Sequence, residues 1–69
     1  FNFPEYVKLI IENYKAGNLP ETERLALIIT RELPDDAFAW KVLGTVYEQT
    51  GRTSDALMAN TKVTDFSPE

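Results

Sequence analysis

Charged and hydroxyl side chains are the residues of this chain that could support catalysis. Glu21 and Glu23 stand two positions apart, and paired carboxylates can act as a general acid and a general base. Thr53 and Ser54 carry hydroxyls that would need a neighbouring base to become nucleophiles. The 69 residues include no histidine and no cysteine, so the commonest base and the thiolate are both missing. We therefore expect no enzyme activity, and we interpret the carboxylates as part of a solvated helix surface.

Adjacent acidic residues also raise the question of a cation site at Asp35 and Asp36. The start of a helix explains this pair better, because a carboxylate there meets the positive end of the helix dipole. Histidine and cysteine ligands are absent, and no glycine-rich loop of the phosphate-binding kind occurs. We predict neither a metal ion nor a cofactor.

The charge balance bears on the partners that the chain could bind. Seven basic residues stand against eleven acidic ones, which gives a net charge of −4. An acidic surface repels phosphate backbones and anionic lipids, so we expect binding neither to nucleic acid nor to membranes. No apolar run approaches the ~20 residues that cross a bilayer. The lack of cysteine fits a reducing compartment, and we expect a cytoplasmic location.

A period of 34 residues relates four pairs of positions, three of which hold structurally special residue types. The pairs are Tyr6 and Trp40, Leu9 and Leu43, Gly17 and Gly51, and Pro34 and Pro68. Repeats of this length with no strand pattern are typical of stacked helical hairpins.

Apolar residues recur at helical spacing in four segments, which predict helices over residues 4–16, 20–33, 36–50 and 53–66. Gly17 and Gly51 follow the first and third segments, where a left-handed residue commonly ends a helix. The links between segments are only a few residues long, so neighbouring helices must be antiparallel. We expect one all-α domain of four helices.

The third and fourth segments resemble the tetratricopeptide (TPR) family. Its signature, W-x2-L-G-x2-Y followed by alanine and proline, is matched by Trp40, Leu43, Gly44, Tyr47, Ala56 and Pro68, with Gly51 between. The resemblance implies two stacked helix-turn-helix repeats that form a short α-solenoid. In such a repeat Gly44 and Ala56 would be small because the two helices approach closely there, and Pro68 would end the last helix.

The two repeats match the family unequally. Residues 37–69 read as a well-formed repeat and residues 3–36 as a degenerate or capping one. In the first repeat Ile10 replaces the glycine and Thr22 the first alanine, so its helices are expected to sit further apart or to cross differently. In the second repeat Asn60 replaces a large apolar residue, which fits either an end of the array or a tolerated substitution.

Membership of this family would imply a protein-interaction scaffold or adaptor, whose concave face is lined by the first helix of each repeat and binds a peptide or partner protein. The candidates on that face are Ile11, Tyr14, Phe38, Lys41, Val42, Thr45 and Gln49. Burial between the repeats is the competing interpretation for Ile11 and Val42. Lys8 and Lys15 lie on the same face of the first helix. Lys41 alone matches the lysines with which some TPR domains clamp a terminal carboxylate, so we expect no clamp.

Two other functions stay open. The chain also resembles TPR segments that precede the catalytic part of some bacterial glycosyltransferases and sulfotransferases. It could instead be a homodimerisation module that pairs through Leu57, Val63 or Phe66. The missing initial methionine and the uncovered ends of a two-repeat stack suggest a piece of a larger protein. We expect the isolated chain to self-associate or to be marginally stable.

Overall fold

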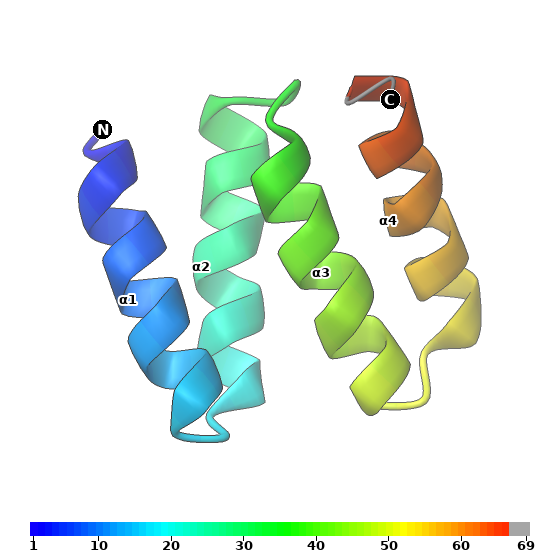
Figure 1. Ribbon diagram of the computed structural model, residues 1–69, viewed down its shortest axis with the longest axis horizontal. Helices are drawn as coiled ribbons and strands as arrows, with labels where there is room; N and C mark the ends of the chain where they lie inside the picture. The colour runs from blue at the N-terminus through cyan, green and yellow to red at the C-terminus, as the bar shows by residue number, and fades with distance from the viewer. Residues whose placement is uncertain (67–69) are drawn as a thin grey trace.

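Four α-helices make up the computed structural model, which describes residues 1–66 (Figure 1). They are α1 (Phe3–Lys15), α2 (Leu19–Glu32), α3 (Ala37–Gln49) and α4 (Thr53–Phe66). Each helix begins and ends within one residue of the bounds predicted from the sequence, and residues 1–66 contain no strand. The predicted helix end at Pro68 lies outside the described residues.

Successive helices run antiparallel, and each packs against the next one along the chain (Figure 1). We call α1 with α2 hairpin 1, and α3 with α4 hairpin 2. The helix α2 contacts both α1 and α3, whereas no Cα atoms of α1 and α3 come within 8 Å of each other. The first helices of the two hairpins therefore lie parallel without backbone contact, and this arrangement leaves side chains to fill or line the space between them.

The turns inside the two hairpins have the same geometry. Gly17 and Gly51 adopt φ values of +78° and +77°, in the left-handed region that glycine enters without steric cost. In each turn the residue after the glycine donates its N–H to the carbonyl five residues back, over 2.9 Å after Gly17 and 2.8 Å after Gly51. This is the hydrogen bond of a Schellman helix end, which satisfies a carbonyl that the helix leaves open.

Side chains at two helix starts satisfy the first free amides. The Asn2 side chain accepts from the Glu5 N–H over 3.1 Å, and the Asp36 carboxylate accepts from the Ala39 N–H over 3.3 Å. Asp36 therefore has the helix-start role that was expected for the Asp35 and Asp36 pair.

The hydrophobic core runs through all four helices. Its buried members are Ile10, Leu25, Ala26, Ile29, Ala39, Leu43, Tyr47, Ala56 and Ala59. Thr22 is fully buried among them, and its hydroxyl donates to the Asn18 carbonyl over 2.9 Å. The one buried polar side chain recorded in residues 1–66 is thus hydrogen-bonded within its own helix, as burial requires.

Helix spacing differs between the hairpins. More pairs of Cα atoms lie within 8 Å of each other between α3 and α4 than between α1 and α2, so hairpin 2 is the more closely packed. This is the difference expected from the bulk of Ile10 and Thr22 in hairpin 1.

The residue that faces Gly44 differs from the one expected from the sequence. A Cβ placed on Gly44 would lie 2.5 Å from Oδ1 of Asn60 and 3.8 Å from Cβ of Ala59. Glycine at this position makes room for the Asn60 side chain rather than for Ala56.

Within residues 1–66, no helix is both long enough and apolar enough to cross a membrane.

Candidate functional site

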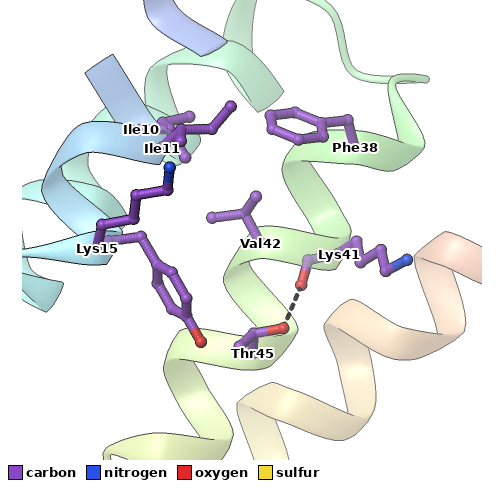
Figure 2. Close-up of a pocket in the computed structure, with 8 residues that line it drawn as sticks. Ile10, Ile11, Lys15, Phe38, Lys41, Val42 and Thr45 are labelled. Carbon is purple, nitrogen blue, oxygen red and sulfur yellow. Dashed lines mark hydrogen bonds between the residues drawn. The ribbon is translucent and has the colours of Figure 1, made fainter. Parts of the chain in front are cut away.

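A hollow of about 480 Å³ lies between α1 and α3 (Figure 2). It exists because these parallel helices are held apart by α2, so that side chains alone bound the space. Four residues of each helix line it: Ile10, Ile11, Tyr14 and Lys15 from α1, and Phe38, Lys41, Val42 and Thr45 from α3. On each helix these positions are spaced by one, three or four residues and therefore share one face.

Six of the seven residues proposed from the sequence line this hollow, and Gln49 does not. Gln49 instead donates a hydrogen bond from Nε2 to the Tyr14 hydroxyl, which links the ends of α3 and α1. Lys15 was expected on the same face. Ile10 was missed, because its place in the repeat pattern assigned it to the packing of α1 against α2.

The residues that line the hollow differ in how much of their surface is exposed to solvent. Ile10 is buried, with 2% of its surface exposed, while Ile11 and Tyr14 at the rim are 43% and 39% exposed. Phe38 and Val42 are half-buried and pack against the core. Burial between the hairpins therefore describes Val42 in part and does not describe Ile11, whose side chain remains open to solvent.

Side chains bridge α1 and α3 towards both ends of the hollow. Near the helix starts, the rings of Phe3 and Phe38 meet edge to face, with their centroids 6.4 Å apart. Near the helix ends, Tyr14 accepts the hydrogen bond from Gln49. In each pair the two residues are 35 positions apart in the sequence. The side chains of α1 and α3 therefore meet with the same offset at both ends of the hollow.

Thr45 and Lys41, two of the polar residues that were expected to contact a ligand, do not direct their polar groups into the hollow. The Thr45 hydroxyl donates to the Lys41 carbonyl over 3.1 Å, inside α3. In Figure 2 the Lys41 side chain extends away from the isoleucines of α1, so that its ammonium group lies outside the hollow. The Lys15 side chain reaches towards Ile10 and Ile11 (Figure 2). The apolar side chains and Lys15 therefore define the accessible chemistry of the site.

The carboxylates first considered for acid–base chemistry are bound to arginines. Glu21 pairs with Arg24 one turn further along α2, and the hydrogen bond from Arg24 lowers the pKa of Glu21. Glu23 receives two hydrogen bonds from Arg52, at 2.9 and 2.7 Å, which join the two hairpins. In residues 1–66, no group of three or more acidic side chains is arranged to hold a metal ion.

The outer side of hairpin 2 carries a second, shallower hollow of about 260 Å³. Glu48, Thr53, Ala56, Leu57 and Asn60 line it. Of the three residues proposed for dimerisation, Leu57 is 69% exposed, whereas Val63 and Phe66 are half-buried. Only Leu57 thus presents most of its side chain to solvent.

Searches of family models, of curated protein sequences and of solved structures find no match to this chain.

Proposed function

We propose that this chain is a protein-interaction segment that binds a peptide or a segment of a partner protein in the groove between α1 and α3. The observation that carries the proposal is the open apolar hollow lined by Ile10, Ile11, Phe38 and Val42. Ligand sites are typically concave and mainly apolar, with a few polar groups. Exposed Ile11 and Tyr14 at the rim would gain contacts when a partner covers them.

A tetratricopeptide architecture is the proposed basis of this groove. Two observations support it: the turns at Gly17 and Gly51 share one geometry 34 residues apart, and Trp40, Leu43 and Gly44 keep the spacing of the family signature. In that architecture α1 and α3 are the equivalent helices of successive repeats, and a groove between them would continue along further repeats.

The groove would hold its partner chiefly by burying apolar surface. An extended chain advances ~3.3 Å per residue, and a helix of the length of α3 measures ~20 Å, so about six residues of a partner would span the site. Because α2 fixes the separation of α1 and α3, little ordering of the groove itself is needed on binding.

The test uses peptides selected on the immobilised chain from a random phage-displayed library. Affinities of the selected peptides are then measured with two variants, Ile11→Gln and Leu57→Gln. Both changes replace an exposed aliphatic side chain with the same uncharged one on a helix surface, but only Ile11 lines the groove. We expect Ile11→Gln to weaken binding by about fivefold to tenfold, and Leu57→Gln to leave it unchanged.

Equal affinities for the wild type and Ile11→Gln would contradict the proposal, as would a loss of binding confined to Leu57→Gln. Circular dichroism of both variants serves as the control for folding, since Gln is a good helix former and neither site is in the core.

Pairing of two copies through α4 is a second candidate, favoured by the exposure of Leu57 and Met58, which are 69% and 44% exposed. Sedimentation equilibrium of the wild type and of Leu57→Glu decides it. A concentration-dependent mass that the Leu57→Glu change abolishes would support a homodimer, and a monomer at all concentrations would contradict it.

A further inference from the structure

The charge around the α1–α3 groove differs from that of the whole protein. The chain carries a net charge of −4, yet no aspartate or glutamate among residues 1–66 lines the hollow. Its two charged lining residues are both lysines, Lys15 and Lys41. An otherwise acidic protein thus presents a locally basic apolar groove, and such local fields select and orient charged partners.

Arg24 and Arg52 form ion pairs with carboxylates, whereas Lys8, Arg31 and Lys62 form none within residues 1–66. Arg24 is paired with Glu21, and Arg52 is paired with Glu23 and lies 3.7 Å from Asp55. In contrast, no carboxylate oxygen of residues 1–66 lies within 4.0 Å of the ammonium group of Lys15 or Lys41. The positive charge at the groove is therefore not neutralised by an ion pair within the described chain.

The two lysines can reach the groove in different ways. Lys15 already extends over the isoleucines of α1 (Figure 2). Lys41 points away from them, but its side chain is exposed, and exposed side chains change rotamer within nanoseconds. An acidic group lying along the groove could therefore meet one ammonium group directly and draw the second towards it.

The lining of the hollow is mainly apolar, so we expect it to bind an apolar group. Ile10 forms its buried wall, and Val42 and Phe38 face it from α3. With about 480 Å³ of space, it can accept a large aliphatic or aromatic side chain. The open rim at Ile11 and Tyr14 lets a polypeptide enter from the side, which suits a chain segment better than an enclosed small molecule.

We propose that the partner is a short extended peptide segment that places a bulky apolar side chain in the hollow and an acidic side chain beside it, against Lys15. This inference rests on the proposed function, because it specifies the chemistry of the same groove.

The experiment is the sequence analysis of the selected library, followed by binding assays with Lys15→Glu and Arg31→Glu. Both variants change the net charge by the same amount, but Arg31 lies at the end of α2, outside the lining of the hollow. We expect the selected peptides to be enriched in Asp or Glu next to Leu, Ile, Phe or Met. Their affinity should fall about tenfold in Lys15→Glu, fall less than about twofold in Arg31→Glu, and weaken as salt is added.

Three outcomes separate the inference from the proposed function. Enrichment in acidic peptides that Lys15→Glu no longer binds supports both. Peptides without an acidic preference that are still lost in Ile11→Gln overturn the acidic partner and leave the groove as the binding site. Peptides whose binding neither Ile11→Gln nor Lys15→Glu changes overturn both.

Discussion

Hairpin 1 and hairpin 2 end their first helices in the same way and pack their two helices differently. The glycine turns coincide in φ and in hydrogen bonding. The helices of hairpin 2 nevertheless pack more closely, with Gly44 against Asn60, whereas hairpin 1 buries the larger Ile10 and Thr22. Turn residues thus set the path of the chain, and the small residues of the interface set how closely the helices pack.

Positions that are 34 residues apart in the two hairpins also differ in the contacts that their side chains make. Glu23 of hairpin 1 binds Arg52, but the position 34 residues later holds Leu57, which is 69% exposed. Tyr14 accepts a hydrogen bond from Gln49, and its equivalent, Glu48, lines the shallow hollow on hairpin 2. At these two positions hairpin 1 thus contacts side chains of hairpin 2, whereas in residues 1–66 the equivalent Leu57 is exposed and the equivalent Glu48 lines the shallow hollow.

We expect the largest change in stability when the equivalent leucines of the two hairpins are replaced by alanine. Leu43→Ala is expected to lower the free energy of unfolding by ~3 kcal/mol, because Leu43 is fully buried between helices, and Leu9→Ala by about half as much, because Leu9 is half-buried. Urea unfolding of the two variants measures both losses. Equal losses would mean that the core is shared evenly between the hairpins, against the packing described above.

The two turns should respond alike to alanine. Gly17→Ala and Gly51→Ala are each expected to cost ~1 kcal/mol, because φ near +78° strains any residue with a Cβ. Among residues 1–66, apart from the adjacent residues in the chain, no atom lies within 4 Å of a Cβ placed at either site, so the expected cost comes from backbone strain and not from a clash. Asparagine at the same positions, which tolerates this conformation better, is the matched control. A loss in one variant alone would show that the turns are not equivalent in solution.

The ion pair between the hairpins should couple them measurably. A double-mutant cycle with Glu23→Gln and Arg52→Gln is expected to give a small favourable coupling free energy that salt reduces, because the pair is bidentate but partly exposed. The Glu21 and Arg24 pair within α2 is the control, and we expect a smaller coupling free energy from this pair on the surface of a single helix. A stronger coupling in the control would contradict a role for Arg52 in joining the hairpins.

The smallest effect concerns Gly44. Gly44→Ala should change stability by less than ~0.5 kcal/mol, because the gain in helix propensity is offset by displacement of Asn60 and loss of its 3.2 Å hydrogen bond to Glu48. In an Asn60→Ala background the same change should stabilise the protein by ~0.5–1 kcal/mol. Thermal unfolding of the four proteins measures the difference, and the same effect in both backgrounds would exclude Asn60 as the relevant neighbour.

The helices and their turns could be predicted from the sequence because their signals are local. Apolar spacing fixed each helix to within one residue, and the glycines fixed the turns. Much of the groove was predictable for the same reason, since residues such as Ile11 and Val42 share a helix face with their neighbours. The assignment to tetratricopeptide repeats and the binding function remain predictions.

The contacts that sequence reasoning missed depend on side chains from separate elements. Arg52 could be placed after a turn, but its pairing with Glu23 across 29 residues requires the relative position of the hairpins. The proximity of Asn60 to Gly44 depends on how far α4 is shifted along α3, which the spacing of small residues does not determine. The direction of Lys41 is a choice of rotamer, and composition carries no signal for it.

Chemical-shift mapping tests the central claim most directly. The ¹⁵N-labelled chain is titrated with a peptide selected from the random library, and the backbone amide shifts are followed residue by residue. We predict that the perturbed amides cluster on the facing sides of α1 and α3, around Ile11, Tyr14, Val42 and Thr45. Shifts confined to the outer side of α4, around Leu57 and Met58, would contradict the α1–α3 groove as the binding site.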